Sequence, residues 1–255
     1  MARVIDVNSS LLGSTLRGWR GTAAFRPVRK QPVKPLEIYE FEACPYGRLL
    51  REALTEMDLD AMIYPCPKGG TRFRPQAQTR GGKMRFPFLL DPNTGVALFE
   101  SAEIISYLAD TYEGTAVPAR GLRRRLAVIT SFLASTTRGL ARVRGYRARP
   151  SKAPAKPLEL YSFESSPFSR LVREVLCELE LPYFLRNSGK ARWHEMGPPW
   201  VRDKLFRRPI EGRNRTALFE RAGKVQLPYL IDPNTGVEMF ESAKIIRYLE
   251  TTYAA

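Results

Sequence analysis

The chain has 255 residues, of which 44% are hydrophobic and 26% charged, a composition that is typical of a soluble globular protein with two domains. No apolar run approaches the roughly 18 residues that span a bilayer, which excludes an integral membrane protein. Three cysteines are too few for a disulfide framework, and a single histidine argues against a zinc site, so we expect no metal.

The net charge of +15 is concentrated in two segments. Residues 1–34 carry seven basic side chains and one acidic one, and residues 115–156 carry eleven basic side chains and no acidic one. Together they hold +17, which leaves a charge of −2 for the rest of the chain. Small residues and proline predict that both segments are flexible, solvated basic arms. Sparse aromatic residues argue against nucleic acid as a partner. The arms are expected either to pack across the other domain or to contact an acidic partner or an anionic membrane surface.

Two stretches of the chain repeat each other. Residues 35–39 return as 157–161, a shift of 122, and residues 91–96 return as 232–237, a shift of 141. The second copy therefore holds about 19 extra residues in its middle. The repeat predicts a basic arm at 1–34, a domain at 35–114, a basic linker at 115–156 and a second domain at 157–255.

In chain order, each copy predicts the same elements. A strand at 36–41 or 158–163 leads through a proline turn into an amphipathic helix, and a second strand follows at 61–64 or 183–185. A variable helical region precedes a strand that begins at Pro87 or Pro228, a Gly-containing hairpin turn and another strand. A last helix starts at Ser101 or Ser242. The order βαβ-α-ββα predicts an α/β fold with a four-stranded mixed sheet in each copy.

One cysteine lies where a strand turns into a helix. Cys44 opens the sequence Cys-Pro-Tyr-Gly directly before the first amphipathic helix. Unpaired N–H groups and the positive end of the helix dipole stabilise a thiolate at that position. The sequence therefore predicts that Cys44 is a catalytic nucleophile.

Three spaced motifs of the first copy together resemble the glutaredoxin-like, amino-terminal domain of glutathione transferases. They are Cys44-Pro45-Tyr46, Phe86-Pro87 and Glu100-Ser101. The layout is also similar to that of tandem proteins built from this domain. The resemblance implies two tandem thioredoxin-like domains and glutathione as the cofactor.

The resemblance also implies roles for single residues. The proline matching Pro87 is cis in the family, and the backbone of the residue before it, here Phe86, pairs with the cysteinyl part of glutathione. Glu100 and Ser101 would bind the γ-glutamyl end, since a carboxylate suits its ammonium group and a hydroxyl at a helix start suits its carboxylate. Tyr46 would complete this binding site. A plainer interpretation is that Ser101 only caps its helix.

The second copy replaces the cysteine by Ser166 in the sequence Ser-Pro-Phe-Ser and keeps the remaining motifs. This resembles serine-type glutathione transferases, in which the hydroxyl donates a hydrogen bond to the glutathione thiolate. Ser166 is thus the second candidate catalytic residue. The retained binding motifs are Leu227-Pro228 and Glu241-Ser242. A degenerate copy that serves as a scaffold is the alternative.

Gly47 stands where a dithiol glutaredoxin has its second cysteine, which favours monothiol chemistry at Cys44. Cys66 follows the second strand and is a candidate partner thiol, because neighbouring parallel strands end at one edge of a sheet. A structural role is the alternative for Cys66 and the expectation for Cys177.

The hypothesis is a glutathione-dependent thiol transferase or reductase acting at Cys44, with a thiol-containing protein as one candidate substrate. Full glutathione transferases continue into a helical domain that forms the electrophile pocket, whereas this sequence ends two residues after Tyr253. We therefore expect thiol–disulfide exchange more than conjugation. The alternative is a noncatalytic scaffold or interaction protein. The expected compartment is the cytoplasm, or an organelle if the Arg-rich amino terminus is a transit peptide.

Overall fold

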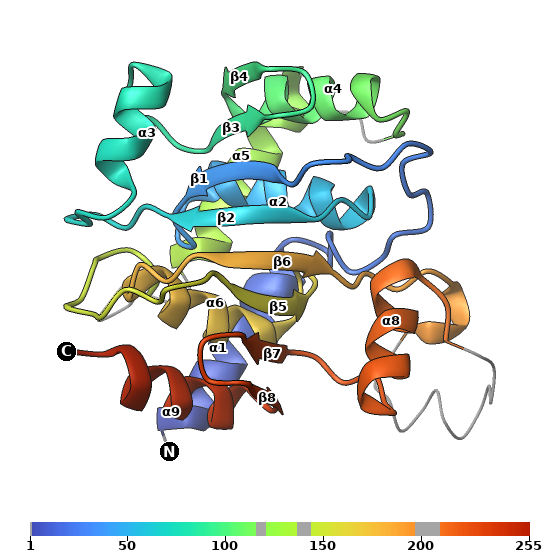
Figure 1. Ribbon diagram of the computed structural model, residues 1–255. Coiled ribbons are helices and arrows are strands. Elements are labelled where there is room, and N and C mark those ends of the chain that lie inside the picture. Colours follow the sequence, from blue (N-terminus) through green and yellow to red (C-terminus); the bar gives the residue numbers. More distant parts are fainter. Residues whose placement is uncertain (1, 116–120, 137–143, 197–209) are drawn as a thin grey trace.

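The computed structural model describes residues 2–115, 121–136, 144–196 and 210–255 (Figure 1). Each copy of the repeat contains the predicted strands and helices in the predicted order. The first copy comprises β1 (Leu36–Glu40), α2 (Pro45–Glu56), β2 (Ala61–Pro65), α3 (Arg74–Gly81), β3 (Phe88–Asp91), β4 (Val96–Phe99) and α4 (Ser101–Thr111). The second comprises β5 (Leu158–Ser162), α6 (Pro167–Glu178), β6 (Tyr183–Asn187), the short 3₁₀ helix η1 (Trp193–Glu195), α8 (Arg213–Ala222), β7 (Tyr229–Asp232), β8 (Val237–Phe240) and α9 (Ser242–Tyr253). Part of the insertion, 197–209, lies outside the described residues.

The strands of both copies join into one sheet, in the order β4-β3-β1-β2-β6-β5-β7-β8. Within each copy, β1 and β2, or β5 and β6, are parallel, and the other two strands are antiparallel to their neighbours. The expected four-stranded sheets are therefore present but not separate. They meet where β2 runs antiparallel to β6, with Met62 opposite Phe184. This pairing covers the edge strand that each copy would otherwise leave exposed.

The hydrophobic core lies on both faces of the sheet. One cluster under α2, α4, α6 and α9 is continuous across both copies and includes Ile38, Leu54, Leu160 and Leu176. Two smaller clusters lie on the opposite face, one beneath α3 around Phe73 and one beneath α8 around Leu218. The continuous cluster means that the two copies share a core as well as a sheet.

The basic arms contain helices, α1 (Ala2–Leu16) and α5 (Gly121–Thr136), where flexible linkers were expected. Each helix packs on the copy that does not come directly after it in the chain. The helix α1, which precedes the first copy, lies against α6 of the second, and α5, which precedes the second copy, lies against α2 of the first. The two helices also contact each other. The contacts are equivalent, since Ser131 Oγ donates to the carbonyl of Pro45 (2.8 Å) and Ser10 Oγ donates to that of Pro167 (3.0 Å). Of the alternatives left open by the sequence, packing across the other domain is the one observed for these helices.

Candidate functional site

The first candidate site is built at the start of α2. Cys44 is the N-cap residue, and its sulfur accepts a hydrogen bond from the Gly47 N–H (3.3 Å). The thiol lies 3.9 Å from the carbonyl oxygen of Phe86, whose peptide bond to Pro87 is cis, as the resemblance implied. The structure therefore brings together two of the three predicted motifs.

The environment of Cys44 does not favour a thiolate. Only 3% of the residue is exposed, and this burial raises the pKa of its thiol to about 11, because it outweighs the Gly47 N–H that would lower the pKa. The predicted stabilisation by the helix amino terminus is thus present, but the predicted net direction of the pKa shift was wrong. Sequence reasoning missed the burial because α5, from a distant part of the chain, packs against α2 beside Pro45.

Glu100 and Ser101 lie at the start of α4. Glu100 is the N-cap residue with φ of +67°, a strained backbone conformation for a non-glycine residue, and its side chain pairs with Arg85 (2.8 Å). Ser101 is buried as the first helical residue, so it is not the cap. Tyr46 is 41% exposed.

The second copy repeats this arrangement with a hydroxyl in place of the thiol. Ser166 caps α6, and its oxygen accepts hydrogen bonds from the N–H (3.2 Å) and the hydroxyl (2.9 Å) of Ser169. These two hydrogen bonds occupy both lone pairs of the Ser166 oxygen, so its hydroxyl proton can still be donated to another group. The Leu227–Pro228 peptide is also cis, and Glu241, with φ of +72°, precedes the buried Ser242.

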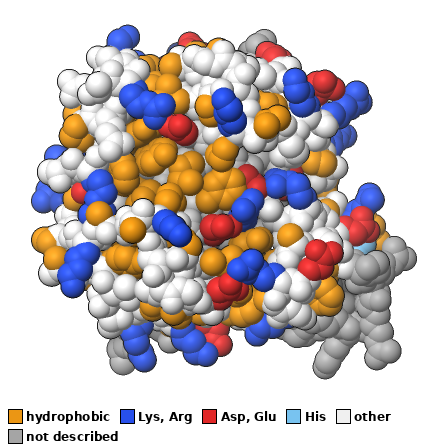
Figure 2. Space-filling model, in the orientation of Figure 1, with side chains coloured by type: hydrophobic (Ala, Val, Ile, Leu, Met, Phe, Trp, Pro, Cys, Tyr) orange, Lys and Arg blue, Asp and Glu red, His pale blue; other side chains and the backbone are white. Residues whose placement is uncertain are grey.

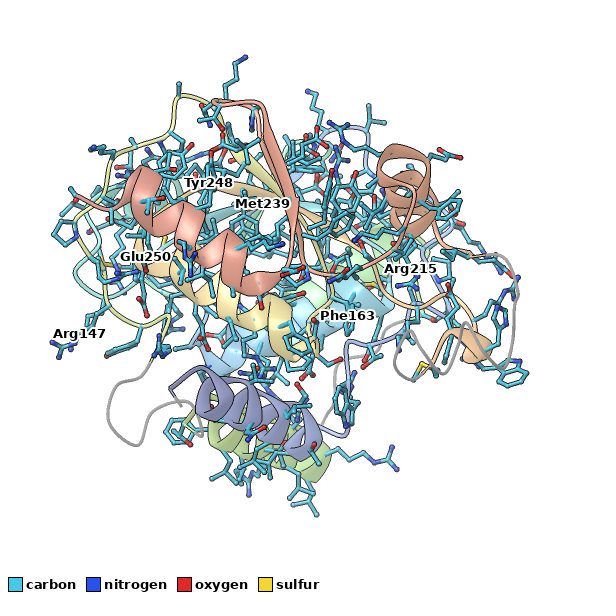
Figure 3. The ribbon with its side chains drawn as sticks, turned by 90° about the horizontal axis from the view of Figure 1, so that it is seen from below. Arg147, Phe163, Arg215, Met239, Tyr248 and Glu250 are labelled. Atoms are coloured by element: carbon cyan, nitrogen blue, oxygen red, sulfur yellow. The ribbon has the colours of Figure 1, made fainter. Side chains whose placement is uncertain are left out.

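A cavity of about 820 Å³ opens at this second site. All the predicted residues of the second copy line it: Ser166, Leu227, Pro228, Glu241 and Ser242. Its other walls come from the arm, through Leu11 and Trp19, and from the second copy, including the residues Phe163 and Arg215 that are labelled in Figure 3. Sequence reasoning missed the walls from Leu11 and Trp19 because they depend on the packing of the arm against a distant part of the chain.

The other two cysteines are Cys66, the candidate partner thiol, and Cys177. All three cysteines are free thiols and buried. Cys66 belongs to the apolar cluster beneath α3, with Tyr39 and Phe73, and burial raises the pKa of its thiol. Cys177 accepts a hydrogen bond from the Glu42 N–H (3.4 Å) and donates one to the Gly145 carbonyl (3.3 Å), which links the two copies.

Among the residues that the structure describes, no group of three or more His, Cys, Asp or Glu side chains is arranged to hold a metal ion. No helix in those parts of the chain has the length and apolar character to cross a membrane.

The fold and the paired sites define a protein of two tandem thioredoxin-like domains. The family model described as "Glutathione S-transferase, N-terminal domain" matches residues 38–116 and again residues 160–255, so the chain belongs to that family. Among solved structures, Bombyx mori glutathione transferase BmGSTD1 is similar over 32% of this chain and 38% of that one, with 25% identity and a TM-score of 0.27. No curated protein sequence matches the chain.

Proposed function

We propose that the protein binds glutathione in its second domain and that Ser166 stabilises the thiolate of the bound tripeptide. The observation that carries this proposal is the cavity, which gathers every motif residue of the second copy around one space. Its volume lies in the range of small-molecule sites. Membership of the glutathione transferase amino-terminal family supports glutathione as the ligand.

Each part of glutathione has a matching group in this cavity. The Glu241 carboxylate suits the ammonium of the γ-glutamyl end, and the Ser242 hydroxyl with the first N–H groups of α9 suits its carboxylate. The Leu227 backbone, before the cis proline, would pair with the cysteinyl part. The remaining proton of Ser166 would then be donated to the sulfur, which lowers the pKa of the glutathione thiol.

Calorimetric titration of the full chain with glutathione tests this proposal. Glu241→Gln removes the charge that pairs with the ammonium and is expected to weaken binding at least tenfold. Glu100→Gln, the same change at the equivalent position of the first domain, is the matched control and is expected to leave affinity unchanged. Ser166→Ala is expected to bind glutathione but to raise the pKa of the bound thiol, followed by thiolate absorbance against pH.

Absence of glutathione binding by the unmodified chain would overturn the proposal and favour the noncatalytic scaffold. Equal weakening by Glu100→Gln and Glu241→Gln would instead place the ligand in both domains and contradict the assignment to the second alone.

Thiol exchange at Cys44 is the second candidate function. The Gly47 N–H on the sulfur favours it, since it would stabilise a Cys44 thiolate. That thiolate would attack the disulfide between glutathione and a protein thiol, take the glutathionyl group and release the protein thiol. A β-carbon at position 47 would meet the Glu40 carboxylate and Cys44 itself, which is a physical reason for glycine in place of a resolving cysteine. The burial of Cys44 opposes this function, and for that reason it ranks second.

A further inference from the structure

The helix α5 exposes its large apolar side chains and buries its small ones. Its buried residues are Ser131, Ala134 and Ser135. Its exposed face carries Leu122 (71% exposed), Leu126 (53%), Ile129 (54%), Phe132 (56%) and Leu133 (47%). At 3.6 residues per turn, four of these, all but Phe132, fall within about 60° of the helix circumference. Such a stripe is the reverse of what a helix packed on a core normally shows.

The neighbouring helix α1 extends this surface. It exposes Leu12 (51%) and Leu16 (38%), and it buries Ser10 and Ser14 against the second domain. Figure 3 shows α1 and α5 side by side as an outer layer beyond α2 and α6, on the side away from the strands. Exposed large apolar side chains on two helices that contact each other are typical of an interaction site.

Arginines flank the apolar stripe. Arg123 and Arg125 project to either side of it, whereas Arg124 lies about 170° from its centre, on the side of the buried Ser131; all three are exposed. No ion pair among the described residues involves any of the three. On the opposite face of the molecule, in Figure 2, basic side chains are interspersed with acidic ones. The α1–α5 layer therefore combines an apolar stripe with uncompensated positive charge.

We propose that the α1–α5 layer docks on an anionic lipid membrane surface, with the apolar stripe in the headgroup region and Arg123 and Arg125 on the lipid phosphates and carboxylates. A membrane of this kind supplies both an apolar interior and negative charge, the two features that the layer matches. A second copy of the chain fits less well, because a symmetric contact would pair α5 with itself, and α5 contains no acidic residue to pair with these arginines. None of the stripe residues of α5 lines the cavity of the second domain, although Leu11 of α1 does.

Co-sedimentation of the full chain with lipid vesicles tests the proposal. We expect binding to phosphatidylcholine mixed with phosphatidylserine, weaker binding at raised salt, and none to phosphatidylcholine alone. The double variant Leu126→Gln with Ile129→Gln is expected to bind at least tenfold more weakly. The triple variant R123Q/R124Q/R125Q is expected to bind about thirtyfold more weakly, because Arg123 and Arg125 each contribute about fivefold near a lipid surface and Arg124 points away from it.

Two controls separate the contribution of this surface to vesicle binding from the effects of net charge and of misfolding. K83Q/K152Q/R247Q removes the same charge from exposed positions on other elements and is expected to lose far less binding than the α5 triple variant. Glutathione affinity and thermal melting check that each variant is folded, since the altered side chains are exposed. Failure of the unmodified chain to bind anionic vesicles, or equal losses in the two triple variants, would overturn the proposal. A dimer that L126Q/I129Q dissociates would also overturn it, because the surface would then belong to a second copy.

Discussion

Cys44 and Ser166 occupy equivalent positions, and each is 3% exposed, yet burial affects their chemistry differently. A thiol acts as a nucleophile only after it becomes charged, and burial penalises the charged form. A hydroxyl donates its proton while neutral, so burial does not oppose a hydrogen-bonding role for Ser166. The same fold position therefore favours a serine-type site in the second domain over thiolate chemistry in the first.

The pKa of Cys44 leads to a direct prediction about its reactivity. With the pKa raised from 9.0 to about 11, the thiolate fraction at pH 8 is about a hundredfold below that of an unperturbed thiol. Alkylation of Cys44 by iodoacetamide is therefore expected to be slow at pH 8 and to keep rising beyond pH 10. Peptide mass mapping at each pH distinguishes Cys44 from the other two cysteines.

Free glutathione in the same reaction mixture is the reference thiol for that measurement. A plateau in the alkylation rate below pH 9 would contradict the prediction. If Cys44 also formed a mixed disulfide in a separate incubation with glutathione disulfide, with release of one reduced glutathione, thiol exchange would become the favoured function.

At the scale of elements, Arg17 links the end of α1 to the helices α2 and α5. Its guanidinium forms two hydrogen bonds to the Glu52 carboxylate on α2 (2.8 and 2.6 Å) and one to the Ala127 carbonyl on α5 (3.0 Å). Both members of the ion pair are buried. One basic residue of the arm is thus a structural group that joins three helices, and not part of a solvated charge run.

Glu52→Gln is expected to destabilise the protein by about 3 kcal/mol, because it leaves the Arg17 charge buried without a counterion. The matched control is Glu56→Gln, one turn further along α2, which breaks the exposed pair with Arg20 and is expected to cost less than about 1 kcal/mol. Urea unfolding of both variants measures the difference. Equal costs would show that the Arg17 pair does not hold α1 in place.

The elements of each copy were predictable because their signals are local. The strand from Leu36, the helix after Cys44 and the turn before Val96 follow from periodicity and turn residues that the second copy repeats. The candidate site residues were likewise found by motif, and five of them line one cavity. The helical arms, the β2–β6 pairing and the burial of Cys44 were not predicted, since each depends on contacts between segments far apart in the chain.

At the scale of the whole molecule, a buried charge network crosses the boundary between the two domains. Glu164 of the second domain contacts Arg51 of the first (2.8 Å), and Glu42 of the first contacts Arg173 of the second (3.1 Å). The two copies differ at one point: Glu40 pairs with Arg51, whereas its counterpart Ser162 accepts from Arg173 (2.9 Å). Burial raises the pKa of Glu40 to about 7. This carboxylate, which the second copy lacks, is therefore close to losing its charge at neutral pH.

Glu164 makes the stability of the whole molecule depend on pH. Burial opposes its ionisation, but Arg173, Arg51 and Arg48 outweigh burial and lower its pKa from 4.5 to about 2. Because the pKa is lower in the folded state, the stabilisation is complete above pH 4.5 and is lost as the pH falls toward 2. Glu164→Gln is therefore expected to cost roughly 3 kcal/mol at pH 7, and this cost should shrink below pH 4.5. Urea unfolding at a series of pH values measures both effects.

Glu238 provides the matched control for this prediction. Its pKa is also lowered to about 2, by hydrogen bonds from Arg221 and Tyr229, but its ion pair lies at the surface, where water and salt screen it. Glu238→Gln is therefore expected to cost less than about 1 kcal/mol at any pH. If the two variants lose the same stability at pH 7, burial does not strengthen the network. In that case the shared sheet and core, and not the charges between the domains, hold the two copies together.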